Sequence, residues 1–189
     1  MRIIAGKCRS LPLKAVPGKT TRPTTDRIKE TLFNILQGYI PGAVFLDLFA
    51  GSGAIGIEAL SRGASHAWFV EHDRTAIRVI QDNLRFAKLT QDADVLQLNA
   101  EDAAIRLEGR AVFDVVFMDP PYGQGLEKNV LLAFRGSPCI YADTLFVIES
   151  SLDTDFSWMQ DFGYDMIKEK CYKTNKHIFA KPAEGACRT

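Results

Sequence analysis

From residue 43 onward the chain alternates apolar, strand-like runs with helical segments, and this alternation constrains the fold more than any other feature. Strands that alternate with helices predict a parallel sheet with helices on both faces. Two further extended runs around residues 173–176 predict an antiparallel hairpin that closes one sheet edge. We therefore expect an α/β fold with a mostly parallel, seven-stranded sheet. The expected strands cover residues 43–49, 66–72, 94–99, 113–119 and 144–151, and the helical segments cover 53–63, 74–89, 101–109 and 126–136.

The N-terminal stretch, residues 1–40, has a different pattern. Short extended runs at 2–5 and 12–16 predict a β-hairpin, and a loop of turn formers and hydroxyl residues follows. A helix is expected from Thr25 or Asp26, and Gly38 and Pro41 end it. The expected organisation is an N-terminal extension, an α/β domain and a short tail, over residues 1–40, 41–182 and 183–189.

Composition excludes several classes of protein. No apolar run reaches the roughly 18–20 residues that span a membrane. The N-terminus lacks the continuous apolar stretch of a secretory signal. The four cysteines are far apart and form no Cys-x-x-Cys pair, so we expect no metal site and reduced thiols in a cytoplasmic protein.

The net charge is zero but unevenly distributed. Residues 1–35 carry eight Lys or Arg and two acids (+6), residues 36–163 carry nine and 18 (−9), and residues 164–182 carry five and two (+3). Basic ends around an acidic middle are compatible with an ordinary solvated surface. They are equally compatible with a polyanion-binding face built from the two ends.

A glycine-rich turn follows the first strand of the alternation. Gly51, Gly53 and Gly56 have the G-x-G-x-x-G spacing of a dinucleotide-binding turn, and Glu71 lies about where such a site places its ribose-binding acid. A carboxylate there can accept the ribose hydroxyls of NAD and of S-adenosylmethionine equally well. Asp47 favours the second cofactor, because a carboxylate near the turn repels a pyrophosphate but stabilises an ammonium and a sulfonium.

Three details of this segment stay open. Asp47 can instead be a structural cap of the turn. Glu58, in the following helix, is expected to add to the acidity near the turn. Gly56 is expected to pack against a neighbouring element rather than contact the cofactor.

The segment Asp119-Pro120-Pro121-Tyr122 follows the fourth strand and points to chemistry on an amine. An amine conjugated to a base ring is a poor nucleophile because its lone pair is delocalised. The Asp119 carboxylate and the Pro120 carbonyl can accept its two N–H groups and direct the lone pair at a methyl group. Successive prolines fix the backbone, and Tyr122 can stack on the base, which contributes roughly 1–3 kcal/mol.

Other candidates are less specific. Asp102, with Glu101 as the second choice, can accept the adenine amino group of the cofactor, although a helix-capping acid explains Asp102 nearly as well. The three histidines form no triad or metal spacing and receive no catalytic role. A nucleophilic serine in residues 144–151 is not supported, because the G-x-S-x-G elbow is missing.

The motifs "DLFAGSG", "FVEHD" and "FMDPPYG", in this order, resemble those of amino-directed, S-adenosylmethionine-dependent methyltransferases with a Rossmann-like fold. The stretch "MRIIAGKCRSLPLKAVPGKTTRPTTDRIKETLFNIL" narrows the resemblance to bacterial 16S ribosomal RNA guanine-N2 methyltransferases (the RsmD type). The resemblance covers nearly the whole chain. Two positions depart from it: the family often has Gly-Arg where this chain has Ser10-Leu11, and a glycine where Lys173 follows Tyr172.

The resemblance implies roles for further residues. Residues 21–27 would form a loop that closes over cofactor and target base. The cofactor-binding set would extend beyond the turn and its acids to Thr25, Phe49 and His72. The residues expected to face RNA are Arg2, Lys7, Arg9, Arg22 and Arg27.

The resulting hypothesis is methyl transfer from S-adenosylmethionine to the exocyclic N2 of a guanine in 16S rRNA, within a small-subunit particle, by a monomer. Three alternatives remain open at this point. They are an adenine-N6 methyltransferase acting on DNA or RNA, an NAD-dependent oxidoreductase, and a non-catalytic RNA-binding protein.

Overall fold

The computed structural model describes residues 1–18 and 26–186 of the chain. It divides into two compact units, Met1–Asn99 and Ala100–Thr189. The first unit contains α1 (Asp26–Ile35), η1 (Leu36–Gly38), β1 (Val44–Asp47), α2 (Ala54–Ser61), β2 (His66–Glu71), α3 (Arg74–Ala87), η2 (Thr90–Asp92) and β3 (Ala93–Gln97).

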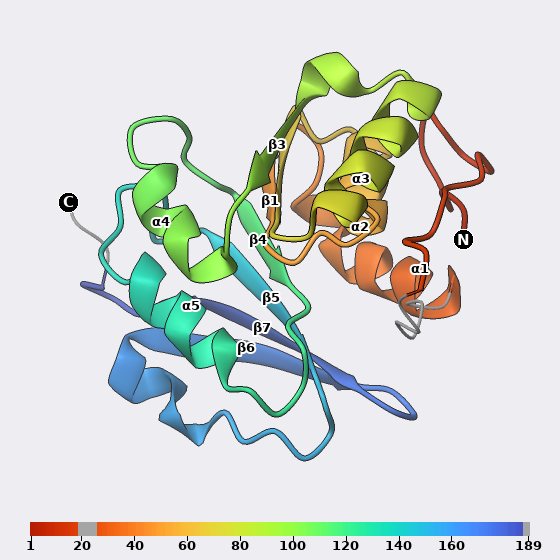
Figure 1. Cartoon of the computed structure of the whole chain (residues 1–189). Helices are drawn as coiled ribbons and strands as arrows, with labels where there is room; N and C mark the ends of the chain where they lie inside the picture. Colours follow the sequence, from red (N-terminus) through yellow and green to blue (C-terminus); the bar gives the residue numbers. More distant parts are fainter. Residues whose placement is uncertain (19–25, 187–189) are drawn as a thin grey trace. The chain divides into compact units, whose positions relative to one another are not determined.

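The strands of the first unit are parallel and lie in the order β3-β2-β1 (Figure 1). Helix α2 packs on β1 and β2, and α3 packs on β2 and β3. At Gly56 an added Cβ would lie 2.3 Å from the Phe69 ring, so only glycine lets α2 approach β2 this closely. Gly56 is therefore a packing glycine, as expected. Because β1 and β2 are parallel, their last residues, Asp47 and Glu71, both lie at the carboxyl ends of the strands, on the same side of the sheet.

The N-terminal segment is not the regular β-hairpin that the sequence predicts. Among residues 1–18 the structure has a single isolated bridge, Arg2↔Pro12, and no named strand. The reason lies in where the backbone hydrogen bonds go: the N–H groups of Ile4 and Ala5 donate to the Glu58 carboxylate at 2.8 and 3.0 Å. Backbone hydrogen bonds still cross between residues 1–3 and 10–13, from Ile3 N–H to the Leu11 carbonyl and from Leu13 N–H to the Met1 carbonyl, both at 3.0 Å. The segment is thus a short, irregular antiparallel pair that α2 also holds.

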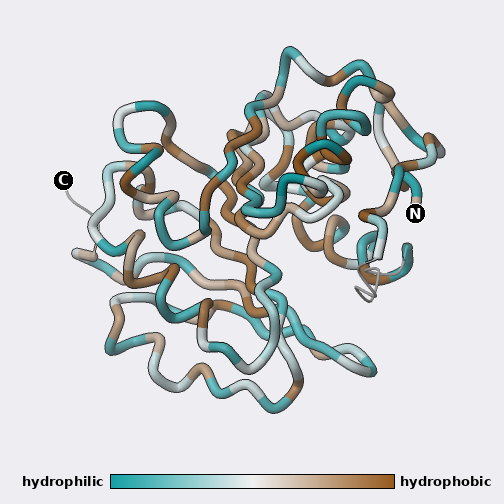
Figure 2. The backbone as a smooth tube through the Cα atoms, in the orientation of Figure 1, coloured by the Kyte–Doolittle hydropathy of each residue, from teal (hydrophilic) through white to brown (hydrophobic). Residues whose placement is uncertain are grey.

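The second unit contains η3 (Ala100–Asp102), α4 (Ala103–Arg106), β4 (Val115–Met118), α5 (Leu126–Phe134), β5 (Leu145–Ser150), η4 (Ser157–Phe162), β6 (Tyr164–Cys171) and β7 (Lys176–Pro182). Its strands lie in the order β4-β5-β7-β6; β4 and β5 are parallel, and β7 is antiparallel to both β5 and β6. Figure 2 shows hydrophobic residues along β4 and β5 and hydrophilic ones at the β6–β7 turn. This gradient matches burial, because β4 and β5 are buried throughout while β6 is exposed after Tyr164.

The expected strand–helix alternation and the C-terminal antiparallel hairpin are confirmed, and seven strands occur in the described part of the chain. The helix expected over 101–109 is wrong in length: a 3₁₀ turn precedes a helix that covers only Ala103–Arg106. In the described ranges no helix is long and apolar enough to cross a membrane.

Candidate functional site

Asp47 is buried at the start of the glycine turn. Its side chain is 1% exposed, and Oδ2 accepts a hydrogen bond from the Gly56 N–H at 3.2 Å. Oδ1 is buried without a hydrogen-bond partner in the described residues. A buried carboxylate oxygen without a donor is costly. Oδ1 is therefore the oxygen of Asp47 at which a donor group of a ligand could bind.

The environment of Asp47 shifts its ionisation. Burial raises the pKa of its carboxyl from 3.8 to about 7, the nearby charge of Glu71 also raises it, and the backbone N–H groups of Gly56 and Phe49 lower it. A positive group placed at Oδ1 would favour the charged form. This carboxylate is thus suited to an ammonium, as the preference for S-adenosylmethionine requires.

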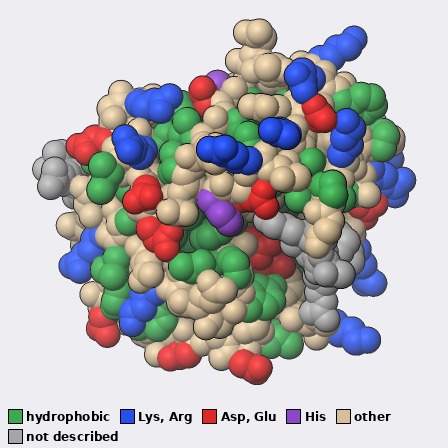
Figure 3. All heavy atoms as spheres, viewed as in Figure 1, with side chains coloured by type: hydrophobic (Ala, Val, Ile, Leu, Met, Phe, Trp, Pro, Cys, Tyr) green, Lys and Arg blue, Asp and Glu red, His purple; other side chains and the backbone are tan. Residues whose placement is uncertain are grey.

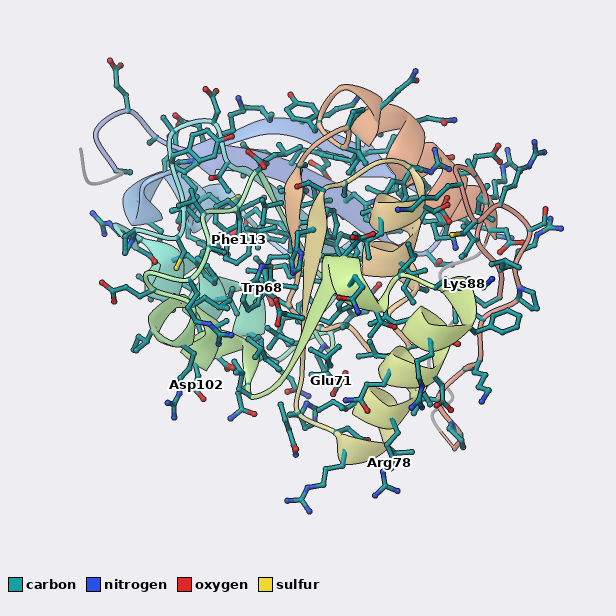
Figure 4. All side chains as sticks on the ribbon, turned by 90° about the horizontal axis from the view of Figure 1, so that it is seen from above. Trp68, Glu71, Arg78, Lys88, Asp102 and Phe113 are labelled. Carbon is teal, nitrogen blue, oxygen red and sulfur yellow. The ribbon has the colours of Figure 1, made fainter. Side chains whose placement is uncertain are left out.

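Glu71 ends β2, where the chain turns toward α3 (Figure 4). Oε2 accepts the Gly51 N–H at 2.9 Å, and Oε1 accepts the N–H groups of His72 and Asp73, both at 2.9 Å. A carboxylate has about four acceptor positions, so these three bonds leave one, on Oε2. Glu71 therefore fixes the glycine turn, and Oε2 keeps an acceptor position. Its role toward the ribose hydroxyls stays a prediction.

Further members of the expected cofactor set belong to the same turn and strand end. Gly51 and Gly53 have positive φ angles of 54° and 78°, and Gly53 caps the N-terminus of α2. The His72 side chain is 70% exposed, with Nδ1 3.2 Å from Glu71 Oε1. Phe49 is half-buried. The structure thus gathers the turn, its two acids and His72 at one edge of the first unit.

Glu58 does not add free acidity to the turn, contrary to expectation. Its carboxylate is fully buried and pairs with Lys29 Nζ at 3.0 Å and Arg62 Nε at 2.8 Å. It also accepts the backbone N–H groups of Ile4 and Ala5. Its charge is compensated, because two cations and two amides contact the same carboxylate. Glu58 joins α1 and the N-terminal segment to α2.

The Asp119–Tyr122 segment follows β4 directly in the second unit. Asp119 is half-buried, Pro120 is buried and Pro121 is exposed. The Tyr122 side chain is 43% exposed, and its hydroxyl donates to Glu149 Oε1 at 3.2 Å. An exposed ring with an anchored hydroxyl has the properties expected of a stacking platform.

A buried polar network lies behind Tyr122, and the sequence alone did not reveal it. Glu149 Oε1 also accepts from Asn175 Nδ2 at 2.6 Å, and Oε2 lies 3.0 Å from His177 Nε2. His177 Nδ1 lies 3.1 Å from the Tyr172 hydroxyl. The available signal was the position of Glu149 near the carboxyl end of β5, where ligand-facing residues of parallel strands occur.

Glu101 and Asp102 lie at the start of the second unit, in η3. Asp102, labelled in Figure 4, is exposed and occupies the N-cap of α4 without a side-chain capping bond. Glu101 is half-buried. The capping explanation for Asp102 is therefore wrong, and its role toward a cofactor stays a prediction.

The residues expected to face RNA are exposed wherever the structure describes them. Arg2 pairs with Asp26 at 2.9 Å, and Lys7 pairs with Asp92 at 3.3 Å. Exposed pairs of this kind contribute only about 0–1 kcal/mol, so phosphates can compete for both cations. Figure 3 shows Lys and Arg side chains toward the right border of the view, over the N-terminal segment and α3 of Figure 1. Arg9 and Arg27 are exposed as well.

Some of the expected residues lie outside the described part of the chain. These are Arg22, Thr25 and most of the loop expected over 21–27. Their roles toward RNA, cofactor and target base stay predictions.

The two departures from the family pattern differ structurally. Ser10 has a φ of 69°, in the left-handed region that favours glycine. Among the described non-glycine residues only Ser10 and Lys88 have positive φ, so Lys173 does not. The replacement at Ser10 therefore introduces backbone strain, and the one at Lys173 does not.

Known proteins share both sequence and fold with this chain. A family model described as "Conserved hypothetical protein 95" matches residues 1–181. The ribosomal RNA small subunit methyltransferase D of Haemophilus influenzae is 35% identical over 90% of this chain and 88% of its own, and that of Escherichia coli K12 is 38% identical over 81% and 76%. The solved structure of the Escherichia coli protein yhhF has 33% identity and a TM-score of 0.81, covering 97% of this chain and 98% of its own. The expected Rossmann-like methyltransferase fold is thereby confirmed, and the chain belongs to the family of conserved hypothetical protein 95 and the ribosomal RNA small subunit methyltransferases D.

Proposed function

We propose that this protein transfers a methyl group from S-adenosyl-L-methionine to the exocyclic N2 of a specific guanine in 16S rRNA. The observation that carries the proposal is the Asp119–Tyr122 segment after β4, with an exposed, hydroxyl-anchored ring, in a member of the small-subunit rRNA methyltransferase D family. The substrate class is inferred from the relatives, and the amine chemistry is inferred from the Asp119–Tyr122 segment.

The residues of the first unit fit the methyl donor. The buried, unpartnered Oδ1 of Asp47 offers an acceptor for an ammonium, and Glu71 keeps one acceptor position for a ribose hydroxyl. S-adenosylmethionine supplies a methyl group on a sulfonium and becomes a neutral thioether on transfer. A dinucleotide fits less well, because the Asp47 carboxylate would face its pyrophosphate. We assign Asp47, Phe49, Gly51, Gly53, Glu71 and His72, together with Glu101, Asp102 and Thr25, to donor binding.

The second unit is assigned to the acceptor. Asp119 and the Pro120 carbonyl hold the two N–H groups of the guanine amine, which lets the nitrogen become tetrahedral as the N–C bond forms. Pro121 helps to fix this backbone. Tyr122 stacks on a base that has left its helix, which offsets part of the few kcal/mol that extrusion costs. The extra proton leaves after transfer, so no strong general base is needed.

RNA affinity is assigned to the basic N-terminal stretch. Phosphate contacts by Arg2, Lys7, Arg9, Arg22 and Arg27 would supply salt-dependent, sequence-independent binding. We keep residues 1–40 as the RNA-binding extension, 41–182 as the methyltransferase domain and 183–189 as a tail. The proposed setting is a small-subunit ribosomal particle in the cytoplasm, and the proposed active form is a monomer.

Mass-spectrometric mapping of 16S rRNA from cells with and without this protein tests the proposal. We expect loss of one N2-methylguanosine, restored when purified protein, S-adenosylmethionine and the undermethylated particle are combined. Loss of N6-methyladenosine instead would favour adenine methylation. An unchanged rRNA, together with tight NADH binding in calorimetry, would favour an oxidoreductase.

A further inference from the structure

The network behind Tyr122 is buried and richly bonded. Glu149 is 6% exposed, Asn175 4% and His177 0%. Three side chains, Tyr122, Asn175 and His177, reach the one carboxylate of Glu149. A buried charge with partners on both oxygens has a defined position, since any movement breaks several bonds at once.

One tautomer of His177 gives every donor in this network an acceptor. Burial and, to a lesser extent, the charge of Glu149 raise the pKa of the Tyr172 hydroxyl to about 12, so this phenol stays protonated at neutral pH. It can donate to His177 Nδ1, which leaves Nε2–H to donate to Glu149 Oε2. Both of these donors then have an acceptor, and the Glu149 carboxylate accepts on both oxygens.

The geometry points to Glu149 as a positioning residue that holds the Tyr122 ring in place for the target base. Tyr122 is the partner of Glu149 that is substantially exposed, at 43%, and it is the residue assigned to base stacking. The β5–β7 pairing supplies the rigid support, because Glu149 lies opposite His177 in an antiparallel ladder. The ring is thus fixed by strands that do not carry the Asp119–Tyr122 segment. This inference rests on the proposed function.

A fixed ring lowers the entropy lost when the base stacks. Without the hydrogen bond from its hydroxyl to Glu149, the Tyr122 ring can still stack on the base. Its position is then fixed only when the substrate binds, which costs entropy. The deficit should therefore appear in RNA turnover and not in donor binding. If the network had only a structural role, the RNA turnover of Tyr122→Phe would instead equal that of the wild type.

The test measures methyl transfer to undermethylated small-subunit particles by Tyr122→Phe, Glu149→Ala and the double variant. The dissociation constant of S-adenosylhomocysteine reports an intact fold. We expect each single variant to lose about tenfold in kcat/KM for RNA, since a hydrogen bond to a charged group is lost. The double variant should lose no more than Glu149→Ala alone, because both changes remove the same bond.

Tyr141→Phe is the matched control. The Tyr141 hydroxyl also bonds a carboxylate, that of Asp114 at 2.6 Å, on a half-exposed ring outside the network. It should retain wild-type turnover.

Wild-type turnover by Tyr122→Phe, or losses that multiply in the double variant, would overturn the inference. If Glu149→Ala does not fold, Tyr122→Phe decides alone, because its ring is half-exposed and its fold is checked by S-adenosylhomocysteine binding. An inactive wild-type protein would refute the proposed function instead, so the two failures are distinguishable.

Discussion

At the scale of single residues, Asp47 links stability to ligand binding. Its carboxyl has a pKa of about 7 in the folded protein against 3.8 ordinarily, mainly because burial penalises the charged form. A raised acid pKa means that the folded state binds the proton more tightly than the unfolded state. The stability from this residue is therefore fully present below about pH 4 and is lost as the pH rises from there to about 7.

Asp47→Asn should accordingly be more stable than the wild type at neutral and higher pH. The gain should reach up to about 4 kcal/mol at pH 8 and shrink toward pH 4, because the variant has no charge to bury. Urea unfolding at pH 5 and pH 8 measures it. Asp143→Asn, which changes an exposed acid paired with Lys181, is the control and should show no such trend. A constant difference between Asp47→Asn and the wild type would contradict the assigned ionisation.

The same ionisation predicts pH-dependent ligand affinity. S-adenosylhomocysteine retains the ammonium of the donor, so wild-type affinity should rise about tenfold between pH 6 and pH 8 as Asp47 becomes charged. Asp47→Asn should bind weakly with a flat profile. Calorimetry at four pH values checks both. Equal pH profiles for the wild type and Asp47→Asn would show that the ligand ammonium does not bind next to Asp47.

Asp119→Ala should separate binding from turnover. We expect a loss of at least about a hundredfold in kcat, because the alanine cannot accept the amine N–H that the carboxylate holds in the transition state. Affinity for S-adenosylhomocysteine should stay nearly unchanged. Asp143→Ala, whose side chain is 76% exposed, should keep wild-type turnover. A fully active Asp119→Ala would show that this carboxylate does not hold the amine.

At the scale of elements, the N-terminal segment shows where a local pattern is insufficient. Alternating short runs predict a hairpin, and residues 1–3 do pair with residues 11–13. The pairing does not extend along the expected runs, because the backbone N–H groups of Ile4 and Ala5 bond to Glu58, which is far away in the sequence. Those bonds depend on α2 being in place, which no short sequence window can reveal. The strands and most of the helices from residue 43 onward were predictable, because their periodicity is set by burial within each element. The exception is the helix expected over 101–109, which covers only Ala103–Arg106.

The absence of long-range contacts from a local pattern also explains which candidate site residues the sequence marks. Asp47, Glu71 and Asp119 lie at or directly after strand ends, so topology alone marks their positions. Glu149 needed the pairing of β5 with β7, which brings His177 opposite it. The position of Glu149 near the carboxyl end of β5 was a signal, but the partners through which it acts were not visible in the sequence.

Ser10→Gly should stabilise the N-terminal segment. Ser10 holds a left-handed φ of 69° while its N–H donates to the Ile3 carbonyl at 2.8 Å, and glycine adopts this conformation without steric cost. We expect a gain of about 0.5–1 kcal/mol and a Tm higher by about 1–4 °C. Thermal unfolding followed by circular dichroism measures it.

Two further variants test whether backbone strain at Ser10 is the cause of that gain. Ser10→Ala keeps the Cβ and should give no gain. Lys173→Gly should lower stability slightly, because Lys173 has no positive φ to relieve and glycine adds freedom to the unfolded chain. A gain from Lys173→Gly equal to that from Ser10→Gly would show that backbone strain is not the cause.

At the scale of the whole molecule, a net charge of zero coexists with regional charges of both signs. The −9 of residues 36–163 would repel a polyanion if it acted on the same surface as the +6 of residues 1–35. Within the first unit, ion pairs neutralise part of this charge. Lys7 pairs with Asp92, and Lys14 pairs with Asp82. These exposed pairs exchange readily for phosphate contacts, since each contributes little.

RNA affinity should therefore depend on salt through the N-terminal cations. Lys7→Gln and Arg9→Gln should each weaken binding to the undermethylated particle at low salt. Each should also reduce the slope of log K against log salt by about 1, because one fewer counterion is released. Arg106→Gln, an exposed cation of the acidic region, serves as control and should leave the slope unchanged. Filter binding between low and moderate salt gives the slopes. Unchanged slopes for both N-terminal variants, with a reduced slope for Arg106→Gln, would place the RNA on the acidic region and refute the assignment to residues 1–40.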